Sequence, residues 1–268
     1  MNQIVINGKS VMSPSSWNEL SRKQLLFVSR LFHGQLTMID FKLRALFKFI
    51  SITPKIKKRL HTEDTYFLCE TLDFLFEEVS LTRNLLPILK TGWRTYVGPS
   101  DAMKNCTFGE FTIANSLLDS FSSTKDQMYL DEMIAVLYRP KKWFWFFRKN
   151  FTDNQDKRKR FAHRTLEKRT VTMADLDFHA KYSVFLFFSG VLNSFPDLYP
   201  YVYQQKGDFG GEDNGWASLI ISLADGKTDD KSLETIMNSN LYNVLIGLNK
   251  KSKEYHEYIN KIESYDRH

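Results

Sequence analysis

Cysteine is scarce in this chain of 268 residues: only Cys69 and Cys106 occur, far apart in the sequence. Two isolated thiols exclude the disulfide-rich scaffolds that many small secreted domains use. We expect both to be free, buried thiols in a reducing compartment, and a disulfide between them is the alternative.

Long hydrophobic runs are also missing. The longest apolar stretch, residues 183–195, is interrupted by Ser189 and Asn193 and is shorter than the roughly 20 residues that a membrane-spanning helix needs. The N-terminus lacks the cationic start and the long apolar region of a secretory signal. The sequence therefore predicts no signal peptide, no transmembrane segment and no integral membrane association, so the protein is expected to stay where it is made.

The motifs of common catalytic sites are absent as well: the sequence has no P-loop, no Gly-x-Ser-x-Gly elbow and no His-Glu-x-x-His. Asp208-Phe209-Gly210 spells a kinase metal-binding triplet, but no other kinase motif accompanies it, so we attribute it to chance. The six histidines lack metal-ligand spacing, and Asp208, Glu212 and Asp213 lack the spacing of a calcium loop. We predict that the protein is not an enzyme and has no catalytic residues, no cofactor and no metal.

Bulky apolar side chains are abundant, since 43% of the residues are hydrophobic and 22 are phenylalanines. This content suffices for one large core or two smaller ones. Hydroxyl residues that precede an acid or amide by three positions predict helix starts. The predicted caps are Ser16, Thr37, Thr107, Thr124 and Thr172. Apolar residues at helical spacing predict helices over residues 17–32, 39–52, 64–79, 108–121, 128–138 and 173–195.

The helix predicted over 173–195 is apolar nearly all round from Val184 onward. We therefore expect it to be the central helix of the fold. Ser189 and Gly190 should let a neighbouring segment approach it closely, and Pro196 should end it.

Strand signals are few. The segment from Ile4 to Val11 places Asn7-Gly8 between β-branched residues, which is a strong signal for a hairpin. Because two strands alone are marginally stable, residues 93–97 are the predicted third strand. The predicted fold class is mainly α, a multi-helix bundle with a small antiparallel β-sheet.

A polar, glycine-rich stretch at 206–215 interrupts the helical pattern. We predict a main helical domain over 1–205 that includes the N-terminal hairpin, a linker over 206–215, and a C-terminal helical pair over 216–268. The pair consists of a short helix at 216–223 and a long helix at 239–262, whose charged end should project from the body. Whether the pair is a separate subdomain or the end of one bundle stays open.

The positive charge is concentrated in one block. Residues 141–169 hold eleven Lys or Arg against three acids, which leaves twenty-six basic and twenty-eight acidic residues in the rest of the chain. The block begins with the aromatic run 143–147. Exposed aromatic rings beside a cationic tract are typical of a contact surface. The predicted partner or nucleic-acid contacts are Trp143, Phe144, Trp145, Phe147, Arg148, Lys149, Lys157, Arg158, Lys159, Arg160 and Arg164.

This block has a structural interpretation too. An exposed basic helix over about 155–169 would pack through Phe161 and Leu166, while the rings of 143–147 would fill the protein's own core. For the aromatic run, core packing is slightly favoured over partner contact. For the basic run, we favour an interaction role.

Several segments together resemble a known set of proteins. They are Ser16-Trp17-Asn18-Glu19-Leu20 after a hairpin, Tyr96-Val97-Gly98-Pro99 followed by Phe108-Gly109-Glu110-Phe111, Val136-Leu137-Tyr138-Arg139-Pro140, and Phe187-Phe188-Ser189-Gly190-Val191-Leu192. This combination is similar to that of uncharacterised proteins encoded in the structural gene clusters of tailed bacteriophages and prophages. These motifs are structural, and none of them carries catalytic chemistry.

The resemblance implies a non-enzymatic role in phage morphogenesis or in the virion, like that of a tail assembly chaperone or a neck or tail component. The implied partners are tail or neck structural proteins, an oligomer is compatible with this role, and the implied location is the host cytoplasm during assembly or the virion. The alternative from a different class is a nucleic-acid-binding protein that uses the basic segment 148–169.

Overall fold

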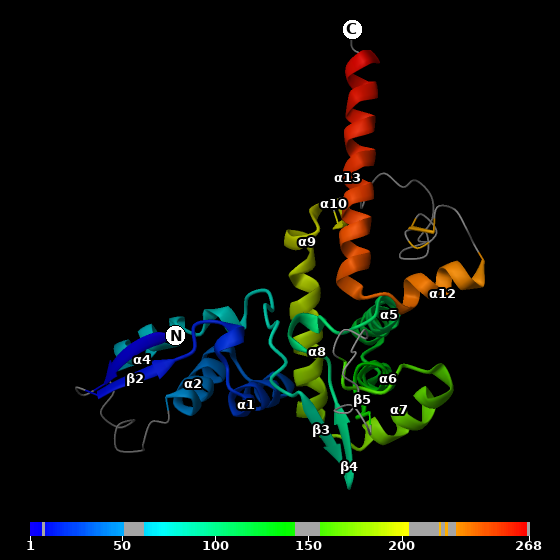
Figure 1. Ribbon diagram of the computed structural model, residues 1–268. Helices are drawn as coiled ribbons and strands as arrows, with labels where there is room; N and C mark the ends of the chain where they lie inside the picture. Colours follow the sequence, from blue (N-terminus) through cyan, green and yellow to red (C-terminus); the bar gives the residue numbers. More distant parts are fainter. Residues whose placement is uncertain are drawn as a thin grey trace. The chain divides into compact units, whose positions relative to one another are not determined.

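The computed structural model describes residues 1–6, 9–50, 62–142, 156–203, 220, 223–224 and 229–266 (Figure 1). Most of these residues are helical, and the strands form two small antiparallel sheets. The predicted fold class, mainly α with a small antiparallel β component, is confirmed. The chain divides into two compact units: unit 1 holds Met1–Pro87 and Asp175–Asn193, and unit 2 holds Ile88–Ala174 and Ser194–His268.

Within the described residues, unit 1 combines a hairpin with four α-helices. Its elements are β1 (Asn2–Ile6), β2 (Lys9–Ser13), a 3-10 turn at Trp17–Glu19, α1 (Arg22–His33), α2 (Met38–Phe49), α4 (Thr62–Glu70), a second 3-10 turn at Asp73–Leu75, and α8 (Phe178–Asn193). Strands β1 and β2 pair antiparallel with Ile4 opposite Val11, which confirms the predicted hairpin. Its Asn7-Gly8 pair lies outside the described residues.

Helix α8 packs against α1 in unit 1 through small residues. The hydroxyls of Ser29 and Ser183 lie 2.8 Å apart in the interior. A Cβ on Gly190 would lie 2.4 Å from the backbone nitrogen of Leu81, a separation that real Cβ atoms do not adopt. The predicted close approach of a neighbour at Gly190 is therefore confirmed.

Three helix predictions in this region are wrong. The helix predicted over 17–32 is a 3-10 turn at Trp17–Glu19 followed by α1, which begins only at Arg22. The stretch 173–195 is not one helix: Met173 belongs to α7 (Leu166–Ala174) of unit 2, and α8 begins only at Phe178. Helix α8 ends at Asn193, and Pro196 lies in the first turn of the short α9 (Phe195–Leu198). The predicted helix 64–79 is the shorter α4 followed by the 3-10 turn. The helical spacing of apolar residues continues across these turns, so the sequence pattern gives no sign of them.

The predicted caps divide into two groups. Thr37 caps α2, and Thr107 caps α5 (Phe108–Thr124) by accepting a hydrogen bond from the Glu110 amide. Ser16, Thr124 and Thr172 are not caps. Instead, Ser21 forms a full capping box with Gln24 at the start of α1, and Asp126 caps α6 (Gln127–Leu137). Thr124 and Thr172 lie within helices, where their hydroxyls donate to backbone carbonyls one turn earlier.

Unit 2 is built on α5 and α6. Its other elements are β3 (Ile88–Thr91), β4 (Arg94–Val97), β5 (Arg139–Pro140), 3-10 turns at Asp101–Met103 and His163–Thr165, α7, α9, α10 (Pro200–Tyr203), α12 (Asp230–Asn238) and α13 (Leu241–Asp266). Helix α6 is almost completely buried from Met133 to Leu137. The core of unit 2 therefore surrounds α6.

The strand at 93–97 exists as β4, but it does not join the N-terminal hairpin. It pairs with β3 on one side and with β5 on the other, and these three strands form a separate sheet. Trp93 lies in the tight turn between β3 and β4 beside Gly92, whose φ is 54°, and its side chain is 87% exposed. The pairing of β4 with β5 joins segments that are far apart in the sequence.

The two compact units do not coincide with the predicted segments 1–205 and 216–268. Helix α13 packs on α10 and α5 of unit 2, and α12, which the sequence did not predict, packs on α5 as well. The far half of α13 extends away from the other elements of unit 2 (Figure 1). The predicted linker 206–215 lies outside the described residues, as does nearly all of the predicted helix 216–223.

Both cysteines are free and buried, as predicted. None of the helices within the described ranges is long and apolar enough to span a bilayer.

Candidate functional site

The most distinctive polar feature of unit 2 is a set of buried charges that three distant segments bring together. Glu110 comes from the first turn of α5, and Arg139 lies on β5 directly after α6. Asp156 and Arg158 come from an extended segment that pairs with the residues around β5. The backbone amide of Lys142 donates to the carbonyl of Lys157 at 2.9 Å, and that of Lys159 donates to Pro140 at 2.8 Å.

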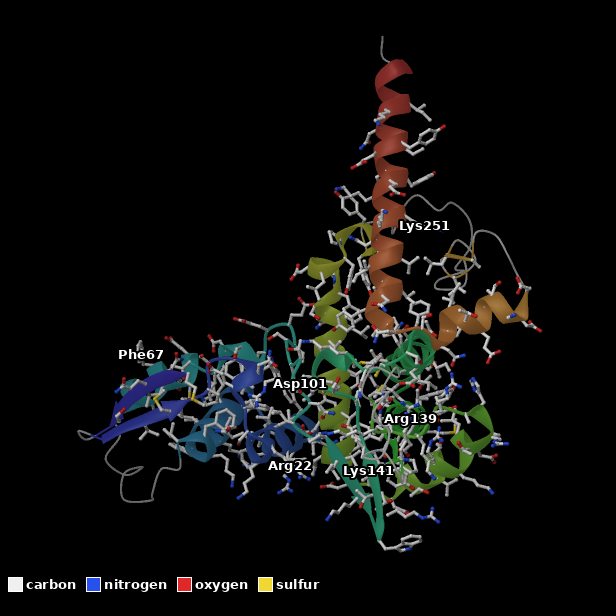
Figure 2. All side chains as sticks on the ribbon, viewed as in Figure 1. Arg22, Phe67, Asp101, Arg139, Lys141 and Lys251 are labelled. Carbon is white, nitrogen blue, oxygen red and sulfur yellow. The ribbon has the colours of Figure 1, made fainter. Side chains whose placement is uncertain are left out.

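These four side chains form a closed ring of ion pairs. The Glu110 carboxylate accepts from Arg139 Nη1 at 2.7 Å and from Arg158 Nη2 at 3.1 Å. The Asp156 carboxylate accepts from Arg158 Nε at 2.8 Å and from Arg139 Nη2 at 3.2 Å. Arg139, which Figure 2 labels among the other side chains of unit 2, is 1% exposed. Arg158 is fully buried. Two positive and two negative charges balance, which is the condition for burying them.

Arg158 also holds the surrounding backbone. Its Nη1 donates to the carbonyl of Leu137 at 2.8 Å, and its Nη2 donates to the carbonyl of Asn105 at 3.1 Å. One side chain therefore links the end of α6 to the loop before α5. Cys106 Sγ lies 3.5 Å from the same Nη2, and burial raises the pKa of this thiol to about 12. Cys106 is consequently a neutral thiol at ordinary pH, not a nucleophile.

The prediction that Arg158 contacts a partner is wrong, because its guanidinium is enclosed by the protein's own residues. Lys157, Lys159, Arg160 and Arg164 are all exposed. The remaining predicted contacts, Trp143, Phe144, Trp145, Phe147, Arg148 and Lys149, lie outside the described residues.

The basic helix considered for 155–169 does not form as such. Residues 156–162 are extended or irregular, and α7 begins only at Leu166. Of the two predicted packing contacts, Leu166 is buried and Phe161 is partly buried. Arg169 also points inward, with its Nε donating to the Ala135 carbonyl at 3.0 Å.

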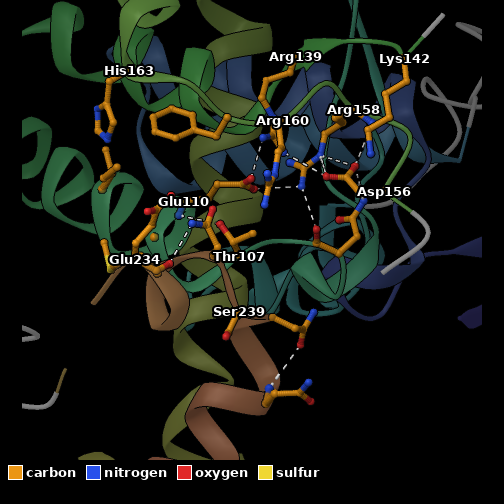
Figure 3. A pocket seen from close by; sticks show the side chains of 18 residues that line it. Thr107, Glu110, Arg139, Lys142, Asp156, Arg158, Arg160, His163, Glu234 and Ser239 are labelled. Carbon is orange, nitrogen blue, oxygen red and sulfur yellow. Dashed lines mark hydrogen bonds and ion pairs between the residues drawn. The ribbon is translucent and has the colours of Figure 1, made fainter. Parts of the chain in front are cut away.

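A cavity of about 600 Å³ adjoins the charge ring. It lies between the start of α5, the segment 156–163, and the junction of α12 with α13. In Figure 3, Lys142, Arg158 and Asp156 lie on one side of the view, His163 and Glu234 on the other, and Arg160 and Glu110 between them. The polar lining also includes Asn105, Thr107, Asn238, Ser239, Asn240 and Asn243.

Sequence reasoning missed Glu110, Arg139 and Asp156. Glu110 matched the acid of a capping box, but only its amide bonds Thr107, while its carboxylate turns to the arginines. Asp156 is one of only three acids in the basic block. Its position two residues before Arg158 was a signal in the sequence for an ion pair between the two side chains.

Within the described ranges, no group of three or more His, Cys, Asp or Glu side chains is arranged to hold a metal ion. Comparisons with protein-family models, with curated proteins and with solved structures give no match to this chain.

Proposed function

We propose that this chain is a non-enzymatic phage morphogenesis or virion protein that acts through contacts with other proteins, as a tail assembly chaperone or a neck or tail component does. The phage assignment rests on the resemblance of its sequence segments. The protein-binding assignment rests on the surface of α13, which is the observation that carries the proposal.

The apolar face of α13 is buried by the rest of unit 2 in the first half of the helix and continues, exposed, into the second half. In the first half, Leu241, Val244, Leu245 and Leu248 are buried. At the same helical spacing in the second half, Tyr255 is 45% exposed and Ile262 is 40% exposed, and Tyr258, at the edge of this face, is 62% exposed. Bulky apolar side chains that recur on one helix face and remain in water are typical of a surface that another protein covers.

The exposed cations of the basic block supply a second contact surface. Backbone hydrogen bonds beside β5 and the buried Arg158 hold this segment against the rest of unit 2. The exposed side chains of Lys157, Lys159 and Arg164 therefore extend from a well-anchored backbone. Such a surface suits an acidic patch on a partner. The aromatic residues 143–147 are proposed as apolar contacts beside it, on the basis of their sequence.

The test is copurification with phage structural proteins. The chain is coexpressed separately with a tail-tube protein, a tape-measure protein and a portal protein of a tailed phage, and we expect a stable complex with one of them. The double variant Tyr258→Ser and Ile262→Ser should lose the complex, whereas Asn260→Ser, a change at an exposed polar position, should keep it. A chain that binds none of the three would contradict the proposal.

Nucleic-acid binding is the second candidate function, favoured by the exposure of Lys157, Lys159, Arg160 and Arg164. Burial of Arg158 removes one cation from that row. If nucleic acid is the partner, affinity falls steeply as salt rises, and Lys157→Gln with Lys159→Gln reduces the salt dependence by about two counterions. Salt-independent or absent binding eliminates this candidate.

A further inference from the structure

The charged residues that line the cavity beside the charge ring fall into two groups. Glu110 and Asp156 are matched by Arg139 and Arg158. The others are Lys142, Arg160 and Glu234, and Lys142 takes part in a further interaction of its own.

Arg160 is the cation of this lining that is available to a ligand. It is exposed, and no carboxylate of a described residue lies within ion-pair distance of its guanidinium. A guanidinium presents paired N–H donors in a plane, which matches the two oxygens of a carboxylate or phosphate. The guanidinium of Arg160 can therefore bind an anionic ligand, whereas that of Arg158 is already paired with Glu110 and Asp156.

Arg139 also lines the cavity, but it is 1% exposed and both of its Nη atoms are paired with the ring carboxylates. Its Nε makes no hydrogen bond within the described part of the chain, and this atom is enclosed by the protein. Arg160 is therefore the arginine of the lining that a ligand can reach.

The remaining lining suits the body of a small molecule. Phe161 and His163 stack edge to face with their ring centroids 4.8 Å apart, and both line the cavity. Thr107, Ser239 and Asn243 add neutral polar groups. The volume of about 600 Å³ lies within the roughly 300–1,000 Å³ of typical ligand sites and exceeds what a bare ion needs.

We propose that this cavity binds a small molecule bearing an oxyanion group, a phosphate or a carboxylate, and that Arg160 forms the principal ion pair with it. Phe161 and His163 contact the uncharged part of the ligand. This site is separate from the protein contacts of α13 and does not depend on them.

Calorimetric titration of the full chain tests the site with four probes: inorganic phosphate, adenosine monophosphate, acetate and benzoate. We expect saturable binding. Adenosine monophosphate should bind more tightly than inorganic phosphate, and benzoate should bind more tightly than acetate. The phosphate and carboxylate pairs identify which oxyanion the site prefers. Because the cavity is open and preformed, a dissociation constant of about 1 mM or below is expected for the best probe.

Three variants at exposed positions give matched controls. Arg160→Gln should weaken the best probe about tenfold or more, since a charge-assisted hydrogen-bond pair is lost. Glu234→Gln should tighten it a few-fold, because a negative charge leaves the lining. Arg164→Gln removes a charge from the same segment outside the lining and should change affinity less than about twofold.

Two results would overturn the proposal. One is the absence of saturable binding of all four probes at about 10 mM, ten times the expected dissociation constant. The other is equal weakening by Arg160→Gln and Arg164→Gln, which would mean that anions bind diffusely to the basic surface.

Discussion

The guanidinium of Arg158 meets the carboxylate of Glu110 inside unit 2, with Nη2 3.1 Å from Oε2. The pair shows that the strongest cationic segment of the sequence is partly a structural element. One arginine of the row Lys157-Arg158-Lys159-Arg160 turns inward and fixes the segment, and its neighbours remain in water.

Removing the charge of Glu110 should destabilise the protein strongly. In Glu110→Gln, Arg139 and Arg158 share only the Asp156 carboxylate, and an uncompensated buried charge costs about 3–5 kcal/mol. Urea unfolding followed by circular dichroism measures this loss. Glu167→Gln, at an exposed position on α7, should change the free energy of unfolding by less than about 0.5 kcal/mol. Equal stabilities of the two variants would contradict the buried ring.

Gly190 should not tolerate a side chain. In Gly190→Ala the new Cβ would lie 2.4 Å from the nitrogen and 2.5 Å from the carbonyl oxygen of Leu81, so the backbones must separate, at a cost of about 1–3 kcal/mol or more. Gly247→Ala is the control, since a Cβ there meets only Leu223 Cδ2, at 3.7 Å. Because alanine favours helix, this control should be neutral or stabilising by up to about 1 kcal/mol. The melting temperature should fall in Gly190→Ala and should not fall in Gly247→Ala. An unchanged melting temperature in Gly190→Ala would contradict the close approach of Leu81.

The start of α1 offers a test of the corrected cap. Ser21→Ala removes the side chain of a complete capping box and should cost about 1 kcal/mol. Ser16→Ala, at the position that the sequence pattern favoured, should cost less than about 0.5 kcal/mol because no cap hydrogen bond forms there. A larger loss at Ser16 than at Ser21 would show that the helix begins where the sequence pattern placed it.

The buried thiols predict how the protein responds to alkali. Burial raises the pKa of Cys106 from 9.0 to about 12, so the folded state retains a proton that the unfolded state has lost above pH 9. The stabilising contribution is complete below pH 9 and disappears as the pH rises to about 12. Tyr242 acts in the same direction, since burial raises its pKa from 10.0 to about 12.

We therefore expect the melting temperature to fall above about pH 9, and to fall less steeply in Cys106→Ala than in the unchanged protein. An identical alkaline slope in both proteins would contradict the buried neutral thiol. As an independent check, neither Cys69 nor Cys106 should react with a thiol reagent at pH 8 until denaturant is added.

Local patterns in the sequence predicted some of the local features. Thr37 and Thr107 cap the predicted helices, and Gly190 lies where a neighbour approaches, because each depends on residues a few positions apart or on the absence of a side chain. The pairing of β4 was not predictable in this way, because its partner β5 is more than forty residues away and only two residues long.

The candidate site was less predictable than the fold. Its charge ring joins Glu110, Arg139 and the segment 156–158, and no spacing rule connects residues so distant in the sequence. Charge density singled out the row Lys157-Arg158-Lys159-Arg160, but it did not separate the inward Arg158 from its exposed neighbours. That separation comes from the backbone pairing beside β5, which turns alternate side chains to opposite faces.

The central claim, that the exposed face of α13 binds a structural protein of the phage, can be tested by photo-crosslinking from single positions. A photoreactive amino acid is placed at Tyr258, on the exposed apolar face, or at Lys253, which is also exposed but lies off that face and near Glu257. The account predicts a crosslink to a tail-tube, tape-measure or portal protein from position 258 and little or none from position 253. Crosslinks of equal yield from both positions, or none from position 258 in the presence of all three proteins, would contradict it.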